Sequence, residues 1–283
     1  RRQRQMCIRD RPHIMMLADD PDCTLIEPIA AHKDSLPKVY EGELMLGGGH
    51  VAGWAVEDPA LIAQIENALT VLGSQEEFDK KYPDATRRDP LTLAVGDGNH
   101  SLATAKACWE ELKKTLTPEQ AENHPARWCL AEVCNVHSPA IEIEPIHRVL
   151  FGVDHEKFMN AFRAAYPNAY EGKGDGHTIE FVWNGESHFI TVPDPKVQLA
   201  VGTLQGVIDQ YLKDNGGEVD YIHGDDTARS LGEKPNCAAV LLPPVEKSGL
   251  FLSVLKNGAL PKKSFSMGNA RDKRYYLECR KIR

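Results

Sequence analysis

A short polar turn, Gly96-Asp97-Gly98-Asn99-His100-Ser101, carries the residue types in this 283-residue chain that are best suited to chemistry. Asp97 could hold a metal ion or a substrate hydroxyl, and His100 could carry a proton or contact a phosphate. Gly96 and Gly98 allow backbone conformations that other residues reach only at a cost, and they let a ligand approach the main chain. A plain turn uses the same residues, because Asp and Asn also satisfy turns and cap helices.

The turn lies between a predicted strand and a predicted helix. The apolar run 91–95 has the length and β-branched content of a buried strand. After the turn, apolar residues recur at steps of three and four, which places one stripe on a helix: Leu102, Ala105, Trp109, Leu112 and Leu116. The first N–H groups of such a helix and its dipole together form a site for an anion, commonly a phosphate. Gly96, Gly98, Asn99 and Ser101 are therefore candidates for binding a cofactor phosphate.

Two polar segments of the second half supply further candidates. His147 follows Pro145 near a predicted strand end, and it is a second candidate for catalysis or phosphate contact. Arg148 beside it could clamp an anion through its planar guanidinium, although the pair could also be a surface feature next to a turn. Farther on, His223 and Asp225 fall in one polar run, 220–226. Asp225 could bind a divalent metal, or it could only cap a helix.

Lys262, Lys263 and Ser264 lie in a predicted loop near the end of the chain. There the two lysines could meet a phosphate as point charges, and Ser264 could join them. A pair of lysines in a loop is also typical of a solvated surface. The glycine-rich run 172–176 imitates a nucleotide loop, but it lies between a predicted helix and a predicted hairpin, so we interpret the match as chance.

The turn and the first residues after it, Gly96 to Ala105, resemble the Asp-Gly-His-His-Arg-Tyr-Glu-Thr-Ala signature of the domain of unknown function 1015 family, whose members are uncharacterised bacterial proteins. Further segments resemble that family in the same order: 13–21, 51–59, 145–149, 221–225 and 260–265. The resemblance runs from about Pro12 to the end of the chain. Members usually carry a further N-terminal region, so we expect this chain to be truncated at its N terminus.

The central motif of that family is similar to loops of sulfiredoxin, of ParB-type proteins and of a free-serine kinase. The resemblance implies a ParB/sulfiredoxin-like core in which the turn holds the phosphates of ATP or ADP with Mg²⁺. Asn99 stands where the family often has His, and Ser101 stands where it has Arg, so a guanidinium contact to phosphate is lost. The turn contains no Cys, which removes the chemistry of sulfiredoxin.

Composition restricts the classes of partner. The net charge of -8 disfavours a sequence-independent hold on nucleic acid, which requires a basic face. No stretch is long and apolar enough to cross a bilayer, and no secretory signal precedes the first predicted strand. The seven cysteines show no paired CxxC spacing, so we expect reduced, mostly buried thiols in a cytoplasmic protein. A small-molecule substrate is the expected partner, and the oligomeric state stays open.

The expected architecture is α/β of the mixed, α+β kind, with mixed sheets and flanking helices rather than a doubly wound sheet. Arg1 to Arg11 is basic and resembles translated sequencing-adapter sequence, so we interpret 1–11 as a non-native leader. Residues 12–150 are expected to form a core domain with the anion site, and 151–283 a second α+β subdomain. Pro59 to Leu72 is predicted to be a helix, and Asn184-Gly185 the turn of a hairpin.

The leading functional hypothesis is a nucleotide-binding phosphotransferase that acts on a small metabolite. Asp97 would orient Mg²⁺ or act as general base, while His100, His147 and Arg148 would contact or stabilise the transferred group. One alternative is a regulatory module that senses a nucleotide or another anion without turning it over. A further alternative, a ParB-like nucleic-acid-associated protein, is disfavoured by the acidic charge balance.

Overall fold

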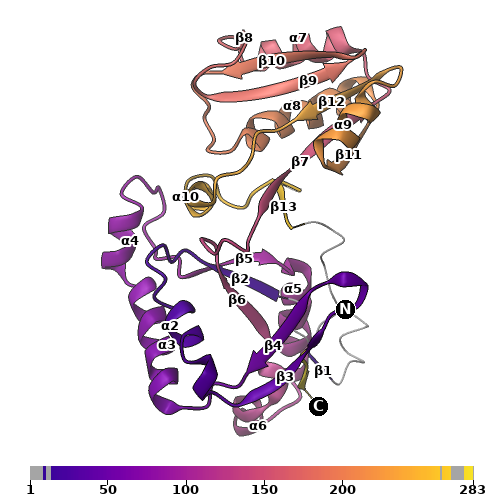
Figure 1. Cartoon of the computed structure of the whole chain (residues 1–283). Coiled ribbons are helices and arrows are strands. Elements are labelled where there is room, and N and C mark those ends of the chain that lie inside the picture. Colours follow the sequence, from indigo (N-terminus) through magenta and orange to yellow (C-terminus); the bar gives the residue numbers. More distant parts are fainter. Residues whose placement is uncertain (1–8, 11–13, 262, 269–276, 283) are drawn as a thin grey trace. The chain divides into compact units, whose positions relative to one another are not determined.

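The computed structural model describes residues 9–10, 14–261, 263–268 and 277–282 (Figure 1). The chain divides into two compact units. Unit 1 contains the described parts of Arg1–Pro83, Asp89–Ser138 and Arg271–Arg283, and unit 2 contains those of Asp84–Arg88 and Pro139–Ala270. Each unit combines helices with a sheet that contains antiparallel strand pairs, which confirms the predicted α+β class.

Unit 1 is built on a sheet with the strand order β5-β2-β6, in which β2 is antiparallel to β5 and parallel to β6. A separate ribbon pairs β3 with β4, and β1 pairs with β14. The strands are β1 (Arg9–Asp10), β2 (Ile14–Ala18), β3 (Lys38–Glu43), β4 (His50–Trp54), β5 (Leu93–Asp97), β6 (Ala131–Asn135) and β14 (Arg280–Lys281). The helices are α2 (Glu27–Ala30), α3 (Pro59–Leu72), α4 (Gln75–Lys81), α5 (Asn99–Lys113) and α6 (Pro118–Asn123).

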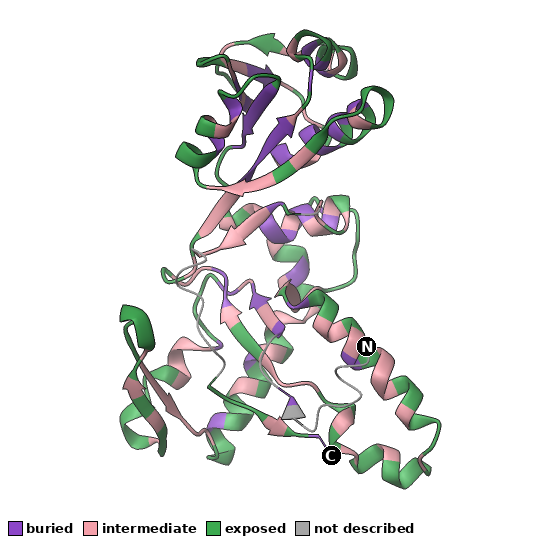
Figure 2. Ribbon diagram, turned by 90° about the vertical axis from the view of Figure 1, so that its right-hand side faces the viewer, coloured by how far each residue is buried: buried purple, intermediate pink, exposed green. Residues whose placement is uncertain are grey.

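Unit 2 contains a larger sheet with the strand order β11-β7-β12-β9-β10-β8, and β13 also pairs with β7. The strands are β7 (Ile143–Phe151), β8 (Tyr170–Glu171), β9 (His177–Trp183), β10 (Glu186–Val192), β11 (Glu218–His223), β12 (Cys237–Leu241) and β13 (Phe265–Met267). The helices are α7 (His155–Ala165), α8 (Ala200–Asn215), α9 (Asp225–Gly232) and α10 (Lys247–Asn257). Figure 2 shows buried residues along the strands of this sheet.

The core of unit 2 follows from the alternation of side chains along its strands. One face, which includes Leu150 and Phe181, packs against α7 and α8 through Phe158 and Leu204. The other face packs against α9 and includes Val149, the residue before Leu150. Burial on both faces explains why β12 reads as a continuous apolar run in the sequence.

Several predicted elements have the expected form. The helix α3 covers the predicted range, and the Asp58 side chain caps it by accepting a hydrogen bond of 2.8 Å from the Ala60 amide. Asn184 and Gly185 have φ angles of 53° and 78°, as a type I′ hairpin turn requires. In unit 1, β3 and β4 pair as an antiparallel hairpin around a glycine-rich segment.

Other features differ from the expectations. β7 runs unbroken through position 150, so His147 and Arg148, which were expected in the first domain, belong to the sheet of unit 2. Within the predicted leader, Arg9 and Asp10 form β1, and the buried Asp10 carboxylate accepts a hydrogen bond of 2.7 Å from the Leu130 amide. The prediction of mostly buried thiols is wrong for the described cysteines, because only Cys237 among them is buried. Every helix in the described part of the chain is too short or too polar to cross a membrane.

Candidate functional site

The predicted turn lies at the end of β5 in unit 1 and leads directly into α5, a helix of 15 residues. Gly98 has φ 83° and ψ 16°, a left-handed conformation that glycine adopts without strain. The first backbone bond of the helix joins the Leu102 amide to the Gly98 carbonyl at 2.9 Å. No side chain of the described residues caps this N terminus, which leaves the amides of Asn99, His100 and Ser101 without a side-chain acceptor there.

A β-bulge sits directly before the turn. Met15 lies opposite Asp97 and Met16 lies opposite Val95, so Gly96 is the extra residue on β5. Bulges of this kind re-aim the side chains beside them. The exposed Asp97 accepts a hydrogen bond of 2.7 Å from the Gly98 amide through Oδ1. Its Oδ2 has no hydrogen-bond partner among the described residues, which leaves that oxygen for a proton or a metal ion.

The structure brings His147 and Asp225 together in unit 2. His147 is 1% exposed, and its Nε2 lies 2.8 Å from Oδ1 of Asp225, the first residue of α9. Its Nδ1 accepts a hydrogen bond of 3.1 Å from the Leu242 amide. Because Nδ1 is an acceptor, Nε2 carries the proton and donates to the carboxylate. Both ring nitrogens are therefore engaged, and His147 positions Asp225, whose side chain is 65% exposed.

Arg148 is fully buried in the same sheet. Its guanidinium donates to Gln205 Oε1 at 3.1 Å and to the Ile146 carbonyl, and it lies over the Tyr221 ring at 5.1 Å. Burial lowers the pKa of this side chain to about 10. These donors face acceptors of the protein, so an anion would have to displace them, and the predicted contact between Arg148 and phosphate stays a prediction.

The other metal and acid–base candidates are distributed over the two units. His223 bonds to Glu144 on the neighbouring strand. Asp225 lies in unit 2 and Asp97 in unit 1. Within the described ranges, His, Cys, Asp and Glu side chains nowhere form a group of three or more that could hold a metal ion. A metal at either Asp would need oxygen ligands from a substrate, as Mg²⁺ commonly takes from nucleotide phosphates.

Ser264 lines a pocket of about 390 Å³ in unit 2 together with His177 and Leu242. The first residues of α8 and α10 also line it, and neither helix has a side-chain cap in the part of the chain that the structure describes. Ser264 is 5% exposed and donates a hydrogen bond of 2.6 Å to the Pro261 carbonyl. Lys263 is exposed, and Lys262 lies outside the described residues.

One polar cluster of unit 1 is absent from the sequence-based expectations. Asp19 accepts a hydrogen bond from His137 Nε2 at 2.5 Å and another from the Tyr82 hydroxyl. Burial, together with the bond to Asp19, raises the pKa of Tyr82, so this hydroxyl stays a donor. Asp19 and His137 follow the parallel strands β2 and β6, whose carboxyl ends meet at one edge of the sheet. The strand signals were readable, but only this pairing brings together residues 118 positions apart.

Comparisons with known proteins agree with the resemblance of the turn. The sequence model of the family described as protein of unknown function (DUF1015) matches residues 2–211. The segments 221–225 and 260–265 therefore lie outside the matched part. A solved structure of a conserved hypothetical protein from Pyrococcus furiosus matches with 12% sequence identity and a TM-score of 0.42, over 69% of this chain and 83% of that one. No curated protein matches. The family match covers most of the chain, and the chain belongs to this family of proteins of unknown function.

Proposed function

We propose that this protein binds ATP or ADP with Mg²⁺ at the turn 96–101 and transfers a phosphoryl group to a small metabolite. The observation that carries the proposal is the uncapped N terminus of α5, which follows a left-handed glycine and has Asp97 and His100 exposed beside it. Amide donors at a helix N terminus and the helix dipole both favour phosphate oxygens.

The turn supplies a donor set that fits such a ligand. Asn99, His100 and Ser101 offer backbone N–H groups to phosphate oxygens, and the buried Gly98 keeps side-chain atoms away from the approach. Asp97 Oδ2 is an oxygen ligand of the type that Mg²⁺ prefers. Bound there, Mg²⁺ would neutralise charge on the phosphates.

As the alternative to holding Mg²⁺, Asp97 could serve as the general base of the transfer. With ATP as donor, the substrate hydroxyl oxygen would form a bond to the γ-phosphorus, while the bond from that phosphorus to the bridging oxygen breaks and its electron pair leaves with ADP; with ADP as donor, the β-phosphorus is transferred and AMP leaves. The hydroxyl proton would pass to Asp97 Oδ2. His100 would donate a hydrogen bond to the transferring group, where charge stabilisation matters most.

Calorimetric titration with ATP and with ADP, with and without Mg²⁺, tests the binding. Asp97→Asn should retain binding of the nucleotide without Mg²⁺ and lose turnover by a factor of about 10² or more, as removal of a general base commonly does. Asp58→Asn is the matched control, because Asp58 is an exposed carboxylate of the same unit that also accepts from a backbone amide. Absence of binding up to millimolar nucleotide would refute the proposal.

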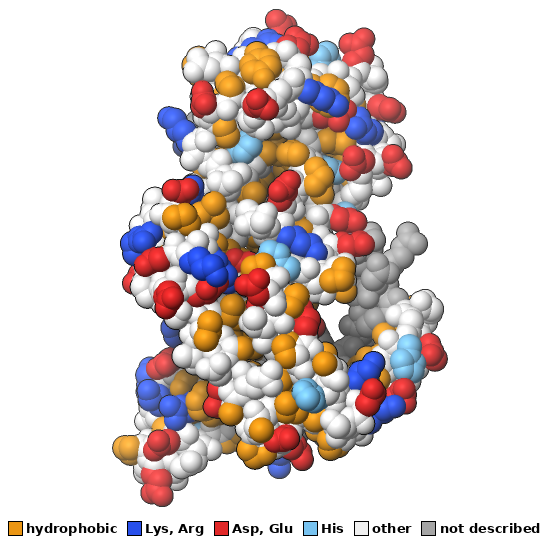
Figure 3. Space-filling model, turned by 60° about the vertical axis from the view of Figure 1, so that its left-hand side comes forward, with side chains coloured by type: hydrophobic (Ala, Val, Ile, Leu, Met, Phe, Trp, Pro, Cys, Tyr) orange, Lys and Arg blue, Asp and Glu red, His pale blue; other side chains and the backbone are white. Residues whose placement is uncertain are grey.

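One observation favours a second function, the sensing of a nucleotide without turnover. Ser101 occupies the family's Arg position, and Arg148 is buried with its donors bonded inside unit 2, so the turn lacks the guanidinium expected of an active phosphotransferase. If the protein is a sensor, nucleotide binding is measured in the calorimeter. No turnover of the nucleotide is then measured with the unsubstituted chain or with Asp97→Asn. Acidic and basic side chains are interspersed on the face drawn in Figure 3. Binding of nucleic acid is favoured by a continuous basic patch, so this face gives no support to a nucleic-acid partner.

A further inference from the structure

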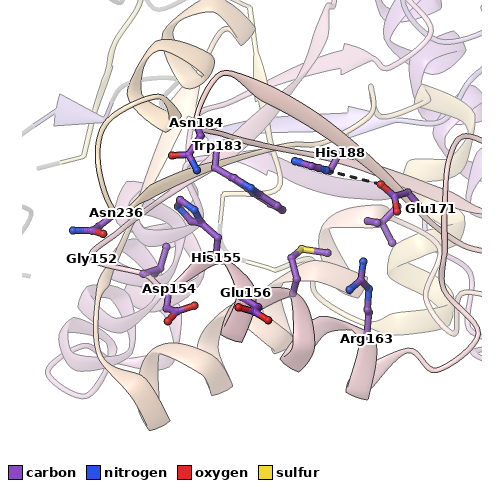
Figure 4. Close-up of a pocket in the computed structure, with 13 residues that line it drawn as sticks. Gly152, Asp154, His155, Glu156, Arg163, Glu171, Trp183, Asn184, His188 and Asn236 are labelled. Carbon is purple, nitrogen blue, oxygen red and sulfur yellow. Dashed lines mark ion pairs between the residues drawn. The ribbon is translucent and has the colours of Figure 1, made fainter.

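A groove in unit 2 contains none of the candidate site residues considered above. It has a volume of about 820 Å³ and lies between α7 and the hairpin of β9 and β10. Figure 4 shows Asp154, Glu156 and Arg163 along the helix, with Trp183, Asn184 and His188 on the other side. At roughly 30 Å³ for each water-sized volume, the groove has room for a ligand larger than a single amino acid.

The floor of the groove is aromatic and held in place. His155 and His188 flank Trp183, with ring centroids 5.3 Å and 4.4 Å from the indole and interplanar angles of 21° and 16° (Figure 4). The Nε2 of His155 also bonds to the Cys237 carbonyl at 2.8 Å. Met159, which is 5% exposed, and Ile190 continue this floor as apolar surface. The floor therefore suits an apolar side chain of a ligand.

Two unpaired charges of opposite sign remain on the helix wall. Asp154 caps α7 and lies 3.9 Å from Lys157, and Glu171 lies 3.9 Å from His188. No ion pair joins Glu156 or Arg163 to another described residue. These two residues are seven positions apart, on the same face of α7 as Met159, which separates them by about 10.5 Å along the helix axis.

We propose that this groove binds a short peptide of about three residues with free ends. An extended peptide advances roughly 3.3–3.6 Å per residue, so three residues match the rise between the two positions on the helix. The terminal ammonium pairs with Glu156, the terminal carboxylate pairs with Arg163, and a central apolar side chain rests on Met159 and Trp183. This site is independent of the nucleotide proposal, because none of its residues belongs to the turn in unit 1.

The test is a titration of the full chain at pH 7 with the tripeptide Ala-Leu-Ala, followed by Trp fluorescence and calorimetry. At that pH the terminal ammonium of the peptide is mostly charged. An ordinary histidine is mostly neutral there, so Glu171→Gln is tested beside Glu156→Gln to separate the two carboxylates. The N-acetylated and the C-amidated peptides should each bind about twofold to fivefold more weakly, the range of an exposed ion pair. Arg163→Met should remove the penalty of amidation alone, and Glu156→Gln should remove the penalty of acetylation alone.

Lys213→Met and Glu233→Gln are matched controls, because they remove the same charges from unit 2 outside the groove and should change neither penalty. Trp183→Phe identifies the fluorescence signal of the groove among the four tryptophans. Three results overturn the proposal: no binding at millimolar peptide, equal binding of free and capped peptides, or tighter binding by Arg163→Met, which would indicate a site for an organic cation.

Discussion

Substitution of His147 separates a positioning role from a catalytic one. His147→Leu keeps an apolar side chain of similar size but removes both ring nitrogens. The Leu242 amide, which donates to Nδ1 at 3.1 Å, would then be buried without an acceptor. An unsatisfied buried donor costs about 1–3 kcal/mol. The lost bond to Asp225 adds at most about 1 kcal/mol, because that carboxylate is 65% exposed.

We therefore expect His147→Leu to lower the free energy of unfolding of unit 2 by about 1–4 kcal/mol. His147→Asn should cost less, because its Oδ1 can take the place of Nδ1 as acceptor for the Leu242 amide. Asp225→Ala should cost less than about 1 kcal/mol. Urea unfolding followed by Trp183 fluorescence measures the differences, and hydrogen exchange at the Leu242 amide should accelerate in the Leu variant alone.

Two results would refute this reasoning. The first is a loss for Asp225→Ala that equals the loss for His147→Leu, since the carboxylate bond would then dominate. The second is a His147→Asn variant that keeps its stability and its nucleotide binding but loses turnover. In that case the imidazole itself would act in catalysis.

Two further predictions concern the packing and the ionisation of unit 2. Gly232→Ala should destabilise it by about 3 kcal/mol, because a Cβ would lie 2.6 Å from Ala239 N and 2.9 Å from Val182 O. The control is Gly206→Ala on α8, where a Cβ meets no atom within 4 Å. An equal midpoint of thermal unfolding for the two variants would contradict the steric argument. Burial lowers the pKa of His177, an effect that the Gln198 carbonyl partly opposes, so the folded state favours the neutral ring. Its contribution to stability is present above the unfolded pKa of about 6.5 and is lost as the pH falls below it. The midpoint of thermal unfolding should therefore drop between pH 7 and 5.5. An equal drop in His177→Gln would show that another group is responsible.

The parts of the fold that the sequence predicts well are those determined by neighbouring residues. The bounds of α3 follow from Asp58 as cap, Pro59 in the first turn and an apolar stripe at helical spacing. The turn at Gly98 is equally local, because the left-handed conformation there is one that glycine adopts without strain. Both were therefore readable without knowledge of the rest of the chain.

The helix α4 is an element that its own sequence does not predict. Its seven residues contain one buried apolar side chain, Phe78, so the 3.6-residue period has too few points to appear. The helix is held instead by contacts to a distant strand end, where Lys81 donates to the Asp19 carbonyl at 2.5 Å and Tyr82 donates to the Asp19 carboxylate. Tertiary contacts, not propensity, therefore fix this element.

The candidate site residues also include some that are positioned by neighbouring residues and some that are positioned by strand pairing. His147 and Asp225 are 78 positions apart, and they meet because β11 runs antiparallel to β7 and returns the chain to the end where β7 begins. The same register sets Arg148 opposite Tyr221 and buries it, although its charge predicted exposure. A polar motif in a sequence thus identifies residues that need partners, and only the strand register decides whether those partners are ligands or the protein itself. Among the described residues, no side chain caps the turn that holds Asp97 and His100, whereas the sheet of unit 2 supplies partners for His147 and Arg148. This difference is the physical reason for placing the nucleotide at α5.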